Sequence, residues 1–258
     1  MKIKKIIAGG LSILLAVGAI SFAPGNGMVT YAATPPSIAS QGAALYNANT
    51  GEFLYEKDGN KQFFPASITK IMTTLIALEQ ADLDDTVVFS KSATTNLESG
   101  ATNLGVVEGD RISVRDALYG TMLESANEVA NGLAEHVGGS IPGFANMMNA
   151  RAGEIGAKNT NFVNPSGLNS QNHKTTAKDM ALIAAEAFRN PNFRAIASTI
   201  YYTFPATKRN PAKSIAMHHK MIQTNDNRYY PGVIGGKTGY TKSAGNTLVT
   251  CAERNGVR

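Results

Sequence analysis

An apolar run from Ile6 to Ala23 dominates the start of the chain and follows three lysines within the first five residues. No further charged residue occurs before Glu52. A basic start, an apolar middle and the small residues near position 33 form the pattern of a secretory signal. A retained membrane anchor is the alternative, but the run is at the short end for a span of about 20 residues. We therefore expect a signal peptide over residues 1–33, a folded domain over 34–258 and a site of action outside the cytoplasm.

The pattern after this leader predicts a β-hairpin and then a buried helix. Two extended runs, Ala43–Asn47 and Glu52–Glu56, flank a short polar turn, as in a hairpin. Pro65 then opens a helical stretch that runs to about Gln80. Lys70 is the only charged residue in most of this stretch, so we expect the helix to be buried on nearly all sides.

Further helices are predicted in the middle of the chain, and strands return after residue 200. Three of the helix starts carry Ser or Thr followed three residues later by an acidic residue, which is a capping pattern. The expected helices run from Ser113 towards Leu123, from Ser125 towards Val137, from Ile141 to Gly156 and from Thr176 to Phe188. The expected strands are Tyr201–Phe204, Val233–Thr241 and Leu248–Glu253. This order predicts an α/β (α+β) fold, with helices inserted between the first hairpin and the later strands of a split sheet.

Composition narrows the class of protein. With 258 residues, 43% hydrophobic and 17% charged, the chain can bury a core and is too apolar for a disordered protein. Removal of the signal would lower the net charge from +5 to +2. The longest basic run is Lys4-Lys5, so the sequence gives no indication of a nucleic-acid partner. The single cysteine, Cys251, excludes an internal disulfide and every multi-cysteine metal site.

Several familiar catalytic patterns are absent from the sequence. There is no Gly-x-Ser-x-Gly elbow, and none of the four histidines stands in a His-Glu-x-x-His arrangement. Gly236-Lys237-Thr238 ends like a phosphate-binding loop, but Pro231 occupies the position of the leading glycine.

Ser67 and Lys70 form the one Ser-x-x-Lys spacing in the chain. Residues three apart share a helix face, so Lys70 Nζ can reach Ser67 Oγ. Pro65 places Ser67 in the first turn, where unpaired backbone N–H groups favour a developing negative charge. Burial disfavours the protonated form of Lys70, and a neutral amine can act as the base that activates a serine. The alternative interpretation is a capping serine beside a lysine whose ammonium reaches solvent.

Two further triplets carry suitable polar groups. Lys237-Thr238-Gly239, in a predicted strand, supplies a cation and a hydroxyl for a carboxylate, and its glycine allows a close approach along the backbone. Ser125-Ala126-Asn127 is the weaker signal, because the same pattern recurs at Ser170-Gln171-Asn172. We prefer the first copy, which lies between two predicted helices, whereas the second lies in a polar, loop-like stretch.

In this order and spacing, the three motifs resemble the set shared by penicillin-binding proteins and serine β-lactamases. The chain looks most like the low-molecular-weight penicillin-binding proteins, the D-alanyl-D-alanine carboxypeptidase family. The likeness covers the chain from about Ala43 to its last residue and includes Phe64–Lys70, Asn161–Leu168, Thr176–Ala181 and Lys237–Thr241. It implies a β-lactamase/transpeptidase-like fold, with an antiparallel sheet flanked by helices and an inserted all-helical subdomain.

The resemblance also implies roles for the first two motifs. Ser67 would be the nucleophile that forms an acyl-enzyme, and Lys70 would be its general base. Ser125 would relay the proton to the leaving D-alanine, and Asn127 would bind the substrate amide.

The strand motif would hold the other end of the substrate. Lys237 and Thr238 would bind its terminal carboxylate, and Gly239 would allow its close approach. The backbone N–H groups of Ser67 and Tyr240 would form the oxyanion hole.

By the same resemblance, the partners would be peptidoglycan stem peptides as substrates and β-lactams as covalent inhibitors. No cofactor, metal or nucleic acid is implied. The location would be extracytoplasmic, at the cell wall or the outer face of the cytoplasmic membrane. A final core strand, a helix and often a small β domain with a membrane-anchoring tail would follow Arg258, so we expect the domain over 34–258 to be C-terminally truncated.

Three rival functions stay open. A class A β-lactamase fits less well, because Ala126 stands where those enzymes carry Asp and their Glu-x-x-Leu-Asn segment is absent. Penicillin should therefore be released slowly. A D,D-endopeptidase would use the same residues, and a catalytically silent wall-binding module would leave no covalent penicillin adduct.

Overall fold

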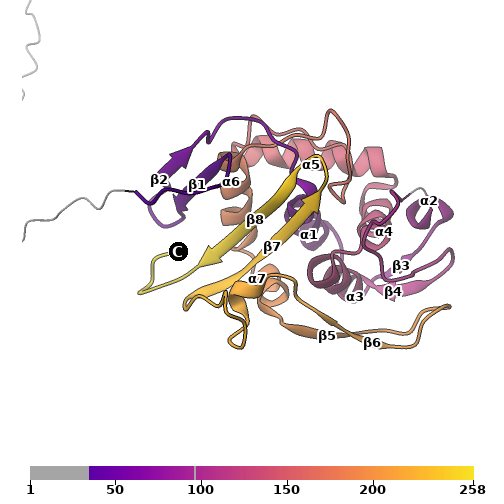
Figure 1. Ribbon diagram of the computed structural model, residues 1–258. Coiled ribbons are helices and arrows are strands. Elements are labelled where there is room, and N and C mark those ends of the chain that lie inside the picture. The colour runs from indigo at the N-terminus through magenta and orange to yellow at the C-terminus, as the bar shows by residue number, and fades with distance from the viewer. Residues whose placement is uncertain (1–34, 96) are drawn as a thin grey trace, which may run out of the picture. The chain divides into compact units, whose positions relative to one another are not determined.

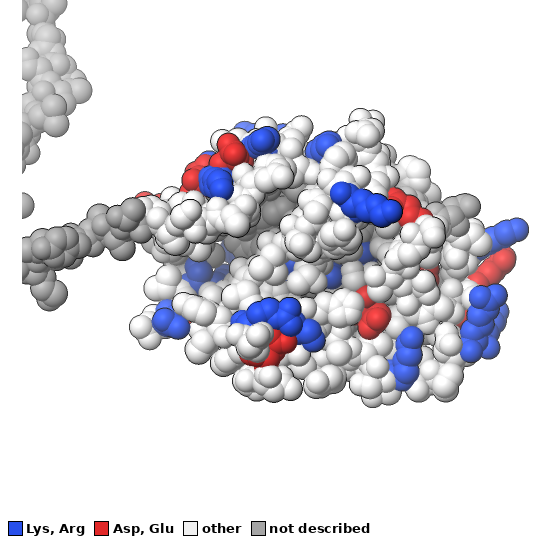
Figure 2. Space-filling model, viewed as in Figure 1, with Lys and Arg blue, Asp and Glu red and all other residues white. Residues whose placement is uncertain are grey.

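Antiparallel strand pairs surround a cluster of helices in the computed structural model, which describes residues 35–95 and 97–258 (Figure 1). The expected signal peptide lies outside these residues. The unit described below is Ile38–Arg258. None of the described helices is both long and apolar enough to cross a bilayer. On the face drawn in Figure 2, basic and acidic side chains are interspersed.

The predicted hairpin and the buried helix are confirmed. Strand β1 (Ala43–Asn47) pairs with β2 (Glu52–Lys57), and α6 (Ala177–Ala187) packs against β1. A 3₁₀ turn, η1 (Ala66–Thr69), leads into α1 (Lys70–Gln80), whose first eight residues are all buried. Helices α4 (Asn127–Gly138), α5 (Ile141–Ile155) and α6 all contact α1, which explains why this helix is buried on nearly all sides.

Three of the other predicted helices are confirmed, and two of the expected caps form. The Ser113 side chain caps α3 (Val114–Tyr119), and Thr176 caps α6 (Ala177–Ala187); each accepts a hydrogen bond from the backbone N–H three residues on. Helix α5 (Ile141–Ile155) is capped by Ser140.

The expected cap at Ser125 is wrong. Helix α3 continues into a π-helical turn, η2 (Gly120–Glu124), and Ser125 ends this turn in the left-handed region, with φ 64° and ψ 29°. An N-cap residue needs extended backbone dihedrals, so Ser125 cannot cap the next helix. Helix α4 (Asn127–Gly138) therefore begins two residues later, after Ala126 and without a side-chain cap.

The strands form four separate antiparallel pairs among the described residues, not one continuous split sheet. The remaining strands are β3 (Thr86–Val88) with β4 (Arg111–Ser113), β5 (Tyr201–Phe204) with β6 (Lys213–Ala216), and β7 (Val233–Thr241) with β8 (Gly245–Ala252). The predicted limits of β5 and β7 are confirmed, whereas β8 begins three residues earlier than expected. The short helices α2 (Lys91–Thr94), α7 (Pro191–Ser198) and η3 (Lys220–Ile222) were not predicted.

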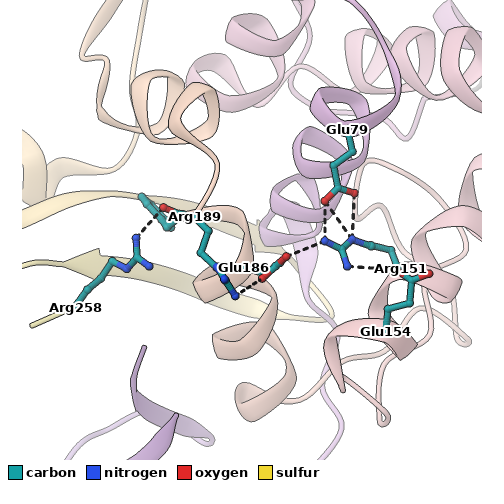
Figure 3. A network of polar contacts seen from close by, with 7 residues as sticks. Glu79, Arg151, Glu154, Glu186, Arg189 and Arg258 are labelled. Atoms are coloured by element: carbon teal, nitrogen blue, oxygen red, sulfur yellow. Dashed lines mark hydrogen bonds and ion pairs between the residues drawn. The ribbon is translucent and has the colours of Figure 1, made fainter. Parts of the chain in front are cut away.

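Arg151 joins three of the helices on the side of α1 that carries Glu79 (Figure 3). Its guanidinium lies 2.8 Å from a carboxylate oxygen of Glu79 on α1 and 2.8 Å from one of Glu186 on α6, and 3.2 Å from Glu154 on its own helix, α5. Glu79 and Glu186 raise the pKa of Arg151, because their carboxylates stabilise its charged form. This network fixes the far end of α1, opposite Ser67.

Candidate active site

Ser67 is half-buried in η1, and the backbone next to it has unusual dihedral angles. The preceding residue, Ala66, has a φ of 51°, which is left-handed and rare for a residue with a side chain. Gly167, with a φ of 85°, packs directly against it, since a methyl group at Gly167 would come within 1.9 Å of the Ala66 carbonyl oxygen. The loop around Gly167 therefore fixes the backbone that presents Ser67.

Lys70 is fully buried and its amine has three polar neighbours. Nζ lies 3.2 Å from Ser67 Oγ, 2.7 Å from Asn127 Oδ1 and 2.6 Å from the Ser166 carbonyl oxygen. This geometry satisfies the predicted contact between the serine and the lysine of the Ser-x-x-Lys motif. The amine therefore bridges three segments that are far apart in the sequence.

The surroundings of Lys70 favour its neutral form. Burial is the main cause that holds its pKa well below the ordinary value, and the nearby charge of Lys237 acts in the same direction. The carboxylate of Glu128 opposes both. Lys70 thus has the low basicity that the apolar sequence around it predicted.

The Ser125-Ala126-Asn127 triplet reaches this amine through Asn127. Asn127 accepts from Lys70 with Oδ1 and donates with Nδ2 to the Thr102 carbonyl oxygen at 2.9 Å, which leaves one amide hydrogen for a ligand. Ser125 is 6% exposed, and its hydroxyl bonds to no other described residue. Asn172 of the rival triplet is exposed. Among the described residues, Asn127 is the only asparagine whose side chain bonds to Lys70.

The third motif lies on β7, which runs beside η1. Lys237 is 1% exposed, and its Nζ donates to the Thr238 carbonyl oxygen at 2.9 Å. Burial lowers the pKa of Lys237 to about 7, and the charge of Glu124 partly opposes this shift. A methyl group at Gly239 would come within 2.7 Å of the Ser67 backbone nitrogen, so only glycine allows the strand this close. Tyr240, the next residue, is 65% exposed.

Sequence reasoning missed the contribution of the loop that contains Ser166. Asn164 Oδ1 accepts hydrogen bonds from the backbone N–H groups of Ser166 (3.2 Å) and Gly167 (2.8 Å), and Thr73 donates to the Pro165 carbonyl at 2.7 Å. This arrangement aims the Ser166 carbonyl at Lys70. The Asn-Pro-Ser-Gly run is a turn signal that predicts such a loop, but the sequence does not show what the loop contacts.

Glu128 is a second residue that sequence reasoning treated only as part of a helix cap. It is 1% exposed, and Oε1 accepts from the Leu104 backbone N–H at 2.6 Å. Its other oxygen, Oε2, is buried and has no partner among the described residues. Burial raises the pKa of Glu128, although the backbone N–H groups around it act in the opposite direction. A buried carboxylate therefore lies in the first turn of α4, next to Asn127.

His173 supports the turn that carries Ser67. Its Nδ1 accepts from the Val163 backbone N–H at 3.1 Å, so Nε2 carries the proton of the neutral ring and donates to Thr69 Oγ1 at 2.9 Å. Burial lowers the pKa of His173 to about 4, and the Lys70 charge adds to the shift. No set of three or more His, Cys, Asp and Glu side chains suited to a metal ion occurs in the described part of the chain.

The structure thus brings together the Ser67 hydroxyl, the buried Lys70 amine and the buried Lys237 amine. A hydroxyl beside a buried, weakly basic amine can attack an acyl carbon. A buried lysine on the adjacent strand can bind a carboxylate. The arrangement is suited to acyl transfer from a substrate that ends in a carboxylate.

Comparison with known proteins agrees with this chemistry. The family model for D-alanyl-D-alanine carboxypeptidases matches residues 29–258. The chain is 34% identical over 224 residues to the D-alanyl-D-alanine carboxypeptidase DacF of Bacillus subtilis, a match that covers 85% of this chain and 55% of that protein. It is 36% identical over 225 residues to DacB2 of Mycobacterium tuberculosis, with 86% and 74% covered.

The chain also matches a relative that is named as an endopeptidase, and it matches a solved structure. The D-alanyl-D-alanine endopeptidase of Escherichia coli is 30% identical over 246 residues, which is 93% of this chain and 75% of that protein. The crystal structure of a D-alanyl-D-alanine carboxypeptidase from Mycobacterium tuberculosis superposes with a TM-score of 0.78 at 34% identity and covers 87% of this chain and 82% of that one. The predicted β-lactamase/transpeptidase-like fold is thereby confirmed. This chain spans little more than half the length of DacF, and it belongs to the D-alanyl-D-alanine carboxypeptidase family.

Proposed function

We propose that this protein is a serine D-alanyl-D-alanine carboxypeptidase, which removes the terminal D-alanine from peptidoglycan stem pentapeptides and is inhibited by penicillin. The observation that carries the proposal is the position of the buried Lys70 amine, 3.2 Å from Ser67 Oγ and close to two acceptors that use its N–H groups. A neutral amine that lies beside a serine hydroxyl can take its proton, and this activates the serine oxygen as a nucleophile.

In the first half of the reaction, Lys70 takes the proton of the Ser67 hydroxyl as Oγ attacks the carbonyl carbon of the penultimate D-alanine. The backbone N–H groups of Ser67 and Tyr240 stabilise the resulting oxyanion. The tetrahedral intermediate collapses as the C–N bond breaks. The proton passes from Lys70 to the leaving amine through Ser125, and free D-alanine departs from an ester on Ser67.

In the second half, water attacks the ester carbonyl and the Ser67–acyl bond breaks. Ser67 regains its proton, and the shortened peptide leaves as a carboxylic acid. Lys237 and Thr238 hold the terminal carboxylate of the pentapeptide during the first half, and Asn127 uses its free amide hydrogen to bind the substrate backbone.

We infer from the proposed substrate that the protein acts outside the cytoplasm. The apolar run after the first lysines supports export through a signal peptide over residues 1–33, with the peptidase domain over 34–258. The protein would then meet peptidoglycan at the cell wall or at the outer face of the membrane.

A D,D-endopeptidase is the second candidate, because a relative that is 30% identical over 246 residues carries that name. The two activities are separated by product analysis on a pentapeptide stem and on a cross-linked dimer. Free D-alanine from the pentapeptide alone supports the carboxypeptidase. Faster cleavage of the dimer supports the endopeptidase and contradicts our first choice.

Covalent labelling by penicillin tests the acyl-enzyme itself. Labelling should vanish in Ser67→Ala and persist, more slowly, in Ser125→Ala, since Ser125 only relays a proton. Labelling of Ser67→Ala would contradict the assignment. Absence of any adduct in the unaltered protein would favour a silent wall-binding module, and rapid turnover of penicillin would favour a β-lactamase.

A further inference from the structure

A cavity of about 450 Å³ lies between the tip of the β7–β8 hairpin and the segment that leads to Ser67. Lys61, Lys174 and Lys242 line it, together with Phe63 and Phe64. None of the described residues that line this basic cavity is acidic. The cavity therefore differs from the Arg151 network, in which carboxylates surround the cation.

The three lysines of the basic cavity have no anionic partner. Within residues 35–95 and 97–258, none of their Nζ atoms forms an ion pair. Lys174 Nζ lies 3.0 Å from the centre of the Phe64 ring, and Lys61 Nζ lies 5.6 Å from that of Phe63. A ring face orients and attracts a cation without neutralising it. The positive charge thus remains available to an anionic ligand.

The cavity lies at a defined distance along β7 from the reacting serine. Gly239 adjoins the Ser67 backbone nitrogen, and Lys242 follows three residues later, just past the end of the strand. A strand rises about 3.3 Å per residue, so Lys242 lies roughly 10 Å further along. Phe64 approaches the same place from the other side, three residues before Ser67.

A peptide substrate can reach this cavity by extending along β7. The edge of β7 that faces away from β8 pairs with no described strand, which is the situation in which an extended peptide adds to a sheet. With its terminal carboxylate at Lys237 and Thr238 and its acyl carbon at Ser67, such a peptide runs towards Lys242. Its third residue before the cleaved bond then falls at the basic cavity.

We propose that the basic cavity is an acyl-side subsite that binds a carboxylate about three residues before the cleaved bond. This inference rests on the proposed function, since it assigns a further contact to the same peptide. The preferred substrates are peptides that are acidic at this position as well as at their C-terminus.

The test compares two synthetic peptides that end in D-alanyl-D-alanine and differ only in Glu or Gln at the third residue before the cleaved bond. We expect kcat/KM to be about 10-fold higher for the Glu peptide, through a lower KM, and the advantage to shrink in 1 M salt. The ratio should fall to about 1 in the double variant Lys174→Gln, Lys242→Gln. Lys91→Gln, on α2, is the matched control and should keep the full ratio.

Charge reversal gives a second, independent readout. In the double variant Lys174→Glu, Lys242→Glu, two carboxylates face the single remaining lysine, Lys61, so a peptide with Lys at the third position should be preferred over the Glu peptide. Penicillin labelling of each variant checks separately that the catalytic residues remain assembled.

Two outcomes would overturn the subsite. One is equal kcat/KM for the Glu and Gln peptides in the unaltered protein, and the other is a preference that survives the double variant. Tighter competition by inorganic polyphosphate than by the Glu peptide, lost in the double variant, would assign the cavity to a phosphate polymer instead. Failure of the unaltered protein to form a penicillin adduct would contradict the proposed function and not the charge of the cavity.

Discussion

The carbonyl oxygen of Ser166 lies 2.6 Å from Lys70 Nζ, nearer than the hydroxyl oxygen of the serine that the amine serves. A carbonyl oxygen can only accept, so it uses one N–H group of the amine. Asn127 Oδ1, at 2.7 Å, uses a second. A neutral amine has two N–H groups and one lone pair, and the lone pair is then left to face Ser67. A loop almost 100 residues away in the sequence thus orients the Lys70 amine.

In the proposed mechanism Lys70 is the base, so its loss should slow acylation without unfolding the protein. Lys70→Met keeps most of the buried stem but cannot accept the Ser67 proton, so we expect the rate of covalent penicillin labelling to fall by about 10²–10⁴-fold. Stopped-flow or quenched labelling measures the rate, and near-UV circular dichroism checks the fold. A rate within threefold of the unaltered protein would show that another group is the base.

The charge of Glu128 should set the pH at which Lys70 becomes active. The carboxylate favours protonated Lys70 and so raises the pKa of the amine, which must be neutral to act. Glu128→Gln keeps an acceptor for the Leu104 N–H but removes the charge, so the acid limb of the acylation rate should move to lower pH.

Glu135→Gln, further along α4, is the matched control because Glu135 bonds to Ser90 and Ser92 away from the site. Its acid limb should coincide with that of the unaltered protein. An unmoved limb in Glu128→Gln would limit Glu128 to a structural role.

Lys237 should impose an alkaline limit on substrates that end in a carboxylate. Its pKa is lowered to about 7, and only the protonated form binds an anion strongly. The kcat/KM for such peptides should therefore fall as pH rises above about 7. A bound carboxylate stabilises the cation, so the limb in kcat should lie at higher pH. A peptide with a C-terminal amide is the control, and identical limbs for both peptides would contradict this role of Lys237.

A single methyl group at Gly239 should disrupt the contact between β7 and Ser67. In Gly239→Ala the new carbon would come within 2.5 Å of Thr247 Oγ1 and 2.7 Å of the Ser67 nitrogen, so strand and serine must separate. We expect penicillin acylation to fall by at least about 10-fold, as for loss of an oxyanion donor.

Gly153→Ala is the matched control. Gly153 lies in α5 with open space around it, and alanine there should raise the free energy of unfolding by about 0.5–1 kcal/mol. Normal acylation by Gly239→Ala would show that the close approach is not needed.

His173 should make the protein sensitive to acid. Its pKa is about 4 in the fold and near 6.5 when unfolded, so the unfolded chain binds the extra proton first. The free energy of unfolding should therefore fall as pH drops from 6.5 to 4, by up to about 3 kcal/mol from this residue. Protonation of Nδ1 also breaks its bond to the Val163 N–H. Urea unfolding across this range should show a shallower pH dependence in His173→Gln, and an equal dependence would contradict the assignment.

The local elements could be read from the sequence because their signals are local. The extended runs of β1 and β2, the apolar α1 and the capped helices α3 and α6 depend on side-chain pattern and on caps within a few residues. The Ser-x-x-Lys contact was predictable for the same reason, since three residues span one helical turn.

Ser125 shows where local reasoning failed. Its sequence looks like a capping box, but a π-helical turn reaches it first and leaves it left-handed. A π turn occurs as a single irregular turn within a helix, and no residue of the apparent capping box indicates it.

The sequence by itself determined the three motifs, the buried helix that begins with Lys70 and the family to which the chain belongs. Only the tertiary structure decided what surrounds Lys70. The Ser166 carbonyl, the Glu128 carboxylate and the closeness of Gly239 to Ser67 come from segments that are distant in the chain. Their approach depends on how helices and strands pack, and such packing has no periodic signature in the sequence.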